Sequence, residues 1–497
     1  MIKYQEQGDL AFQLLVKSQL MTKPISFQEL MKYCLTPVPY SLGTPDGFLA
    51  KTDKAKMVHY VMSDFLENVL LPINNCLHIE DGNAFIHSLK DLPPTFGLIC
   101  AKVLDMMSHK GDFVFSTDSY QPLSIKSQER LRRGYSEKLL LSGVNTRRPP
   151  DIKLFLHNDE NKLQLFHMLL KVWSSGDSSE KLAGRSAILI VEGVANHLYV
   201  ESGQTVNAEI HELRSNQEET DSRIILYIEY AIMNGYDSVV IRSPDSDIFF
   251  ILMYYANHRK YKINVYFDTG VGKHRRIIDI SKTAESLGDQ YTEALLGIYI
   301  FTGEDCTSAF KGKGKVGPLK KLHKYPKFQK VFTELGVDWD VTESSLKLLE
   351  SFTCIMYGHP RLNNIDEVRE IMLKKMVGED ETLNSKSKVD LARLPPCKKS
   401  LHPHIRRANY RAALWKRSHI PIFEHPSATG HGWMVNDDGH MEPHWSDGPV
   451  LPPSLIDILQ SGKEDGQSDS DTDDEDGMDD FEDILDNMDC LSDSDDE

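Results

Sequence analysis

The sequence predicts an α/β fold with a mostly parallel central sheet. Residues 237–243 (DSVVIRS) and 262–268 (KINVYFD) contain short apolar runs of the kind found in strands that are buried on both faces. The amphipathic stretch 218–235 precedes the first run and ends at a glycine, which is typical of a helix. Strands that alternate with such helices favour a parallel sheet covered by helical layers.

The remaining elements extend this pattern in both directions. Helical pieces are expected up to residue 70, around a joint rich in proline and glycine at 37–47. Periodicity then predicts strands within 74–86, 112–118, 186–193, 197–202 and 206–213, and helices over 94–107, 127–143 and 161–173. Helical patterns dominate from about 280 to about 380, and no internal repeat is visible.

The chain is long enough for more than one folded unit, and six regions are expected. They are an N-terminal helical region 1–70, an α/β core 71–303, a helical extension 304–380, a linker 381–396, a basic helix with a Gly-, His- and Trp-rich segment 397–460, and an acidic tail 461–497. Within the fifth region, residues 430–445 predict a structural hairpin. Its basic helix is expected either to pack its aromatic residues or to contact nucleic acid.

The net charge of −18 belongs almost entirely to the C-terminal tail. Residues 463–497 contain 18 acidic residues and one lysine, so the rest of the chain is nearly neutral. Such a tail is expected to be disordered. Two roles are equally compatible with the tail. Its charge favours a purely solubilising role, and the apolar residues at helical spacing within 479–489 favour binding of a protein partner.

Cysteine spacing and hydropathy exclude several classes of protein. The seven cysteines lack the paired spacing of a zinc ribbon or a disulfide framework. There is no apolar run long enough to cross a membrane, and the N-terminus lacks a secretory signal pattern. These features predict an intracellular protein without a membrane partner.

Acidic residues collect where the predicted strands end. Asp81 and Asp118 each follow a strand, and Asp245 and Asp247 follow a third one. Because the carboxyl ends of parallel strands share one edge of the sheet, these four side chains are expected to converge. Anions held a few Å apart repel each other unless a cation lies between them.

Three further acids extend this pattern. Glu219 and Asp221 open the helix of 218–235, where they suit either a metal site or the helix dipole. Asp305 precedes a Gly-x-Gly turn with several lysines, which is either a plain basic loop or a surface for a phosphodiester backbone.

Taken in order, five segments of the chain resemble the successive motifs of the flap endonuclease/XPG branch of the PIN-like nucleases. They are IEDGNAF (79–85), FVFSTDSYQPLSIKSQERLRRG (113–134), EETDSR (218–223), RSPDSD (242–247) and FTGEDCTSAFKGKGKVGPLKKL (301–322). The match is closer still to mobile-element-associated animal proteins of this type. It covers roughly residues 75 to 340.

The resemblance implies a PIN-like three-layer fold, a helix-two-turn-helix extension and hydrolysis of DNA with two Mg²⁺ or Mn²⁺ ions. It implies metal binding by Asp81, Asp118, Glu219, Asp221, Asp245, Asp247 and Asp305. It implies contact with the scissile phosphate by Lys126 with Arg130, Arg132 or Arg133. It implies DNA binding by Lys311, Gly312, Lys313, Gly314, Lys315, Lys320 and Lys321. A substrate of branched or flapped DNA and a nuclear location are implied as well.

The first Asp of the pattern comes at position 81, so another segment replaces the family's amino-terminal part near the site. Between residue 133 and Glu219 the family's elements that thread the 5′ end are not recognisable. Three other interpretations are open: a nuclease-derived DNA-binding or scaffold protein without catalysis, an RNase of the broader PIN group, and a transposase. The paired acids argue against the transposase, because an Asp/Asp/Glu site needs only separated ones.

Overall fold

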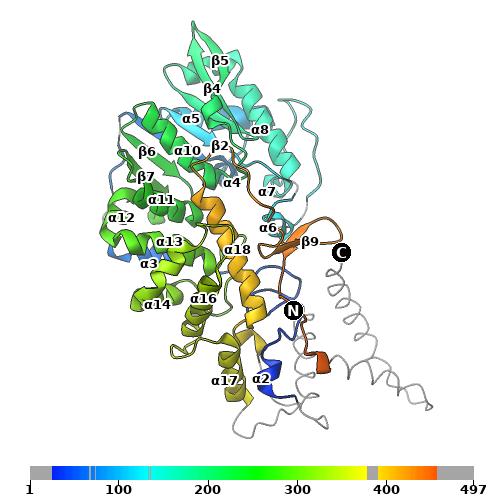
Figure 1. Ribbon diagram of the computed structural model, residues 1–497. Helices are drawn as coiled ribbons and strands as arrows, with labels where there is room; N and C mark the ends of the chain where they lie inside the picture. The colour runs from blue at the N-terminus through cyan, green and yellow to red at the C-terminus, as the bar shows by residue number, and fades with distance from the viewer. Residues whose placement is uncertain are drawn as a thin grey trace, which may run out of the picture.

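The structure is a computed structural model that describes residues 25–65, 69–72, 74–121, 123–132, 134, 136–377 and 390–455. Its centre is an eight-stranded sheet in the order β5-β4-β3-β2-β1-β6-β7-β8 (Figure 1). The strands are β1 (Cys76–Asp81), β2 (Phe113–Ser116), β3 (Ala187–Val191), β4 (Val194–Glu201), β5 (Gln204–Glu209), β6 (Ser238–Arg242), β7 (Asn264–Thr269) and β8 (Arg276–Asp279).

The central strands β3, β2, β1, β6 and β7 are parallel, whereas β4, β5 and β8 add antiparallel edges. In the register of the sheet, Ile79 lies opposite both Val114 and Ile241. The carboxyl ends of β2, β1 and β6 therefore lie side by side. The predicted α/β class with a mostly parallel sheet is confirmed.

Helices cover both faces of the sheet (Figure 1). Before β6 they are α2 (Phe27–Leu30), α3 (Ala55–Val61), α4 (Gly82–Ser88), α5 (Phe96–Ser108), α6 (Ser127–Arg132), α7 (Ile152–Phe155), α8 (Asp159–Trp173), α9 (Ser179–Leu182) and α10 (Thr220–Met233). After β6 they are α11 (Ser246–Arg259), α12 (Ile280–Leu287), α13 (Asp289–Phe301), α14 (Val316–Lys324), α15 (Gln329–Glu334), α16 (Glu343–Met356), α17 (Ile365–Val377) and α18 (Lys398–Lys416).

The alternation of side chains along β2 shows how the layers form. Phe113 and Phe115 point into one apolar cluster with α5 and α8, whereas Val114 points into the other, with α10, α11 and α13. The two clusters exclude water from the two faces of the sheet. This packing holds the ends of the strands in place relative to the helices that follow them.

Segments from both sides of the predicted core pack onto it. Met57 and Val61 of α3 belong to the larger cluster, as does Trp415 of α18. Helix α18 runs through the lower half of the molecule beside α13 and α16 (Figure 1). Although its sequence is basic, Arg407 and Arg411 are buried. The first of the two expectations for this helix, packing, is the one that the structure shows.

One predicted helix is much shorter than expected. The pattern over 127–143 predicted a single helix, but α6 ends at Arg132 and residues 136–143 are irregular. Side chains of α8 replace the helical hydrogen bonds there, because Asn161 Oδ1 accepts from Leu139 N at 2.8 Å and Gln164 Oε1 accepts from Leu141 N at 2.9 Å. The predicted hairpin within 430–445 is confirmed as β9 (Trp433–Val435) and β10 (Met441–Pro443).

Several expectations concern residues outside the described part of the chain, namely those for residues 1–24, for most of the linker and for the acidic tail. The division into six regions stays a prediction. Among the helices that the structure describes, none is both long enough and apolar enough to span a bilayer.

Candidate metal and nucleic-acid site

The predicted acids meet at the carboxyl edge of β2, β1 and β6. Asp81 is the last residue of β1 and caps α4, Asp118 follows β2, and Asp245 caps α11 directly after β6. Asp221 lies in the first turn of α10 and Asp247 in the first turn of α11. Strands β2, β1 and β6 are parallel neighbours and therefore end at the same edge of the sheet, which brings these acids together.

Hydrogen bonds hold the first two carboxylates in place. Asp81 Oδ1 accepts from Ala84 N at 3.0 Å, and its Oδ2 accepts from Ser243 Oγ at 2.9 Å. Asp118 Oδ1 accepts from Thr220 N at 2.9 Å, and its Oδ2 accepts from Asn83 Nδ2 at 2.7 Å. Donors of this kind fix the direction of a carboxylate without neutralising its charge.

Within the described part of the chain, Asp221, Asp245 and Asp247 form a close acidic group, with one oxygen of each within 4.8 Å of the others. The Asp247 side chain is fully buried, and its Oδ2 has no hydrogen-bond partner. A buried anionic oxygen without a partner is costly unless a cation satisfies it. Carboxylate oxygens are the ligands that Mg²⁺ and Mn²⁺ prefer, so the residues present fit a divalent metal ion.

Beside this group lies a cavity of about 210 Å³. Its lining combines six of the seven predicted acids with basic and aromatic side chains: Asp81, Asn83, Ala84, His87, Asp118, Tyr120, Lys126, Glu129, Arg130, Lys162, Glu219, Asp221, Asp245 and Asp305. A phosphate that entered would meet both carboxylates and cations.

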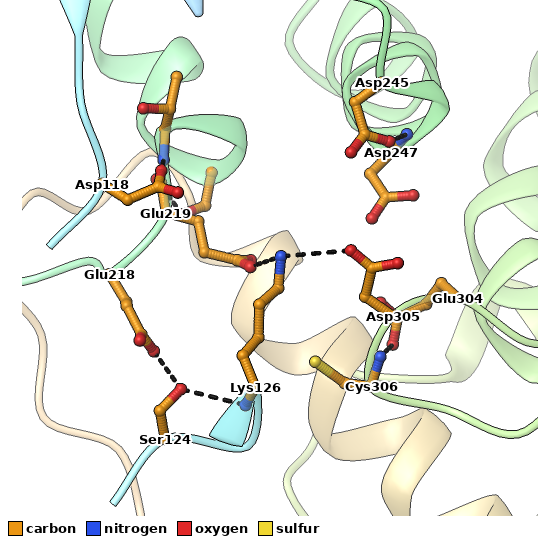
Figure 2. Close-up of polar contacts among 12 residues, drawn as sticks. Asp118, Ser124, Lys126, Glu218, Glu219, Asp245, Asp247, Glu304, Asp305 and Cys306 are labelled. Carbon is orange, nitrogen blue, oxygen red and sulfur yellow. Dashed lines mark hydrogen bonds and ion pairs between the residues drawn. The ribbon is translucent and has the colours of Figure 1, made fainter. Parts of the chain in front are cut away.

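Lys126 lies between two of the predicted acids (Figure 2). Its Nζ forms an ion pair with Glu219 Oε1 and lies 3.6 Å from Asp305 Oδ2. Its backbone N–H donates to Ser124 Oγ at 3.0 Å, and Ser124 donates in turn to Glu218 at 2.5 Å. The side chain is mostly buried, so the ammonium is fixed at the wall of the cavity.

The second carboxylate oxygen of Glu219 binds the buried guanidinium of Arg411, which belongs to α18. Arg411 Nη2 donates to Glu219 Oε2 at 2.6 Å, and Arg411 Nε lies 3.5 Å from Glu304 Oε2. Glu304 is also buried and accepts from Cys306 N at 2.9 Å. Cations engage both oxygens of Glu219, so this residue connects Lys126 with Arg411. Its expected role as a metal ligand stays a prediction.

Lys54, the residue before α3, reaches the acids from the N-terminal side. Its Nζ lies 2.9 Å from Asp247 Oδ1, 2.9 Å from Asp305 Oδ1 and 3.5 Å from Asp245 Oδ1. Burial alone would lower the pKa of Lys54, but the surrounding carboxylates outweigh it and raise this pKa well above its ordinary value. The ammonium is therefore a permanent positive charge within the site.

The carboxylates differ in how far cations compensate them. Burial, followed by repulsion from Asp118, raises the pKa of Asp81 to about 7. Burial, followed by repulsion from Asp247, raises the pKa of Asp245 to about 6. Burial and its acidic neighbours raise the pKa of Asp221 well above its ordinary value as well. On this side of the site the nearby lysines do not outweigh burial and the repulsion between the acids.

The other side is compensated. Burial alone would raise the pKa of Asp305, but Lys126 and Lys54 outweigh it and hold this pKa well below its ordinary value. The pKa of Asp247 is lowered in the same way, chiefly by Lys54 acting against burial. The site thus has a less compensated half around Asp221 and a half in which lysines dominate.

The predicted phosphate-binding arginines lie in different positions. Arg130 lines the cavity, pairs with Glu218 and lies 3.4 Å from Asp159. Arg132 is not part of the lining, and its Nη2 pairs with Glu129 at 2.7 Å. Arg133 lies outside the described residues.

The Gly-x-Gly loop joins α13 to α14. Gly312 and Gly314 are exposed and have positive φ, at 74° and 58°, and a side chain at either position would meet no atom within 4 Å. Their backbone is therefore open to a large ligand.

The lysines around the loop are not equivalent. Lys311 and Lys320 are exposed, while Lys313 and Lys321 are half-buried. Lys315 differs from the expectation, because its buried ammonium donates to the Tyr299 carbonyl inside the core. Its position excludes it from a surface that binds DNA.

Lys54 and Arg411 are two charged site residues that sequence reasoning missed. Each lies outside the segments that resemble the nuclease motifs, and neither has a neighbour in sequence that suggests a site. Arg411 lies in the basic helix of the fifth predicted region. The sequence places an excess of carboxylates at one edge of the sheet, and this excess predicts that further cations lie nearby, without saying which residues supply them.

Solved structures similar to this chain include the T5 D15 protein and the catalytic core of Rad2. The T5 D15 protein, co-crystallized with metal ions, is 13% identical, with 60% of this chain and 93% of that chain covered and a TM-score of 0.29. The catalytic core of Rad2, in complex with a DNA substrate, is 11% identical, with 70% of this chain and 92% of that chain covered and a TM-score of 0.29. No protein-family model matches the chain, and no curated protein matches it.

Proposed function

We propose that the protein is a metal-dependent DNA nuclease that hydrolyses phosphodiester bonds with two divalent ions, Mg²⁺ or Mn²⁺. The observation that carries this proposal is the group Asp221, Asp245 and Asp247, with the buried and unpartnered Oδ2 of Asp247 among its oxygens. Divalent ions at this group would neutralise a phosphodiester and activate the attacking water. Asp81 and Asp118 complete the oxygen ligands around the cavity.

The chain's own residues supply the other parts of the reaction. Lys126 and Arg130 line the cavity with positive charge, and we assign them to binding the phosphate of the substrate. Glu219 and Arg411 hold Lys126 in position through one continuous set of ion pairs. A fixed ammonium needs no reorganisation when charge develops on the phosphate, which favours the transition state.

We also propose that the loop between α13 and α14 binds the DNA backbone. The open backbone of Gly312 and Gly314 suits hydrogen bonds from N–H groups to phosphates, and Lys311 and Lys320 add charge that is independent of sequence. A preference for branched or flapped DNA and a nuclear location belong to the same proposal.

The test is cleavage of labelled single-stranded, duplex and 5′-flap DNA, with an RNA control, in Mg²⁺ or Mn²⁺. The wild type should cut DNA only with the metal, and the double variant Asp245→Asn/Asp247→Asn should not cut. Asp289→Asn is a matched control, because Asp289 is an exposed acid outside the site. Cleavage that persists in the double variant would contradict the assignment of these residues.

One observation favours a second candidate, a nuclease-derived DNA-binding protein without catalysis. Lys54 already provides a cation for Asp247 and Asp305, as it would in a site that no longer takes metal. That candidate predicts DNA binding with neither cleavage nor metal binding. A preference for RNA in the same assay would instead indicate an RNase.

A further inference from the structure

Lys54 is held in the site by its backbone as well as by its charge. The helix that follows it buries Met57, Val58 and Val61 in the core, and the Lys54 carbonyl accepts from Met57 N at 3.2 Å. The Lys54 side chain is only 21% exposed. Its ammonium therefore does not belong to a freely moving surface lysine.

A second lysine of the same segment anchors the facing loop. Lys51 Nζ donates to the Asp305 carbonyl at 2.7 Å and lies 3.1 Å from Glu129 Oε2. Farther along, Ala309 N donates to the Ala50 carbonyl at 2.7 Å. The segment around residues 50–54 is thus tied to the loop that carries Asp305, and Lys54 and Asp305 are positioned together.

The three oxygens around the ammonium are those that a metal ion would use. They come from Asp245, Asp247 and Asp305, and Asp245 and Asp247 also belong to the acidic group with Asp221. Asp247 Oδ1 takes the ammonium, while its Oδ2 is buried without a partner. One carboxylate therefore faces a lysine on one oxygen and has the other available for an ion.

We propose that the Lys54 ammonium occupies one of the two cation positions of the site, so that one divalent ion binds freely and a second must displace Lys54. This inference rests on the proposed function, because it divides the same carboxylates between a metal ion and a lysine. Lys54 supplies one positive charge where an ion would supply two, so the exchange changes the charge at the substrate phosphate. The chain would control the second ion through its own N-terminal segment.

The test is a titration of the metal-free protein with Mn²⁺. Binding is measured by calorimetry and by the electron paramagnetic resonance signal of the free ion. The wild type should bind one ion tightly and a second one weakly. In Lys54→Met the second ion should bind at least about tenfold more tightly, because the competing charge is gone. Lys56→Met is the matched control, since Lys56 lies two residues after Lys54 and its side chain is 69% exposed.

Thermal unfolding in EDTA gives a second measurement that does not depend on activity. Lys54→Met leaves three buried or half-buried carboxylates without their shared cation, so its melting temperature should fall. Mn²⁺ should then raise the melting temperature of this variant more than that of the wild type. Lys54→Arg, which keeps the charge, should retain the weak second site.

Each outcome decides the question. If the wild type and Lys54→Met bind the first ion with the same affinity and also the second ion with the same affinity, the role of Lys54 is overturned. The proposed nuclease then remains intact. If neither protein binds Mn²⁺, the inference and the two-ion nuclease both fail. If Lys54→Met alone binds Mn²⁺, the inference holds in a stronger form, in which Lys54 excludes metal from the free protein.

Discussion

Arg411 carries a buried charge between two buried carboxylates, which makes its removal expensive. In Arg411→Met, Glu219 loses its partner at 2.6 Å and Glu304 loses its nearest guanidinium. Breaking one side of a buried ion pair costs about 3 to 5 kcal/mol, and a loss of this size in the free energy of unfolding is expected. Urea denaturation followed by circular dichroism measures it.

Arg406 is the matched control on the same helix. It pairs with Asp447 at 2.9 Å, and both side chains are 34% exposed. Arg406→Met should therefore cost about 1 kcal/mol or less, because water still reaches both partners of this half-buried pair. Equal losses in the two variants would show that Arg411 does not compensate buried charge.

His404 of α18 should make the protein sensitive to acid. Burial, followed by the neighbouring Arg407, lowers the pKa of His404 from 6.5 to about 3. Because the unfolded chain takes up the proton first, the stability from neutral His404 is complete above about pH 6.5 and is lost as the pH falls. His404→Gln removes the titration and keeps a donor for the Phe301 carbonyl, which His404 Nε2 contacts at 2.9 Å.

Below about pH 6.5 each pH unit costs about 1.4 kcal/mol, so between about pH 7 and about pH 4.5 the wild type should lose roughly 2.5 kcal/mol more than His404→Gln. Urea midpoints measured across this range give the difference. Parallel pH profiles for the two proteins would rule out a buried neutral imidazole at this position.

At the level of single residues, the sequence predicted the acids and Lys126 but missed the counterions Lys54 and Arg411. Asp81, Asp118 and Asp245 follow strands, and parallel strands end at one edge, so local pattern was enough to bring them together. Lys54 and Arg411 reach the same place from distant segments. Their positions depend on how α3 and α18 pack, which no local periodicity contains.

The loop between α13 and α14 makes a prediction at the scale of an element. Gly312→Ala/Gly314→Ala should weaken DNA binding by about tenfold, because a methyl group at each position obstructs the open backbone. The positive φ angles add roughly 1 to 2 kcal/mol of strain at each residue, so the melting temperature should fall only modestly. Fluorescence anisotropy with labelled duplex DNA measures the affinity.

Gly439 is the control for this strain. It lies in the turn between β9 and β10, has a φ of 76°, and a side chain there would meet nothing within 4 Å. Gly439→Ala should lose about half as much stability as the double variant, because it strains one residue instead of two, and it should leave DNA binding unchanged. If it weakens binding equally, the strain and not the loop surface explains the effect.

The strands were predicted more successfully than the connections. The continuous apolar run of β6 specifies a buried strand by itself, because few other structures can bury it. The segment 136–143 had a helical pattern, but Asn161 and Gln164 of α8 bind its backbone in another conformation. A contact between distant parts of the chain overrode the local preference there.

For the whole molecule, the site is assembled from three parts of the chain. The strands and helices between residues 76 and 305 supply the seven acids, the segment before β1 supplies Lys54, and α18 supplies Arg411. The resemblance to nuclease motifs covers the first part alone. Both added parts bury apolar side chains in the same cluster as the sheet, so fold and site depend on them together.

A fragment limited to residues 71–380, the predicted core with its helical extension, should therefore not fold cooperatively. It lacks Met57 and Trp415, which the larger apolar cluster buries, and it leaves the acids of the site without Lys54 and Arg411. The fragment 25–455 should unfold in a single transition. Coexpression of residues 25–380 with 390–455 should restore the fold, since α18 packs through contacts that need no covalent link. A fragment 71–380 that melts sharply and binds Mn²⁺ would show instead that the core is autonomous and that the flanking segments only regulate it.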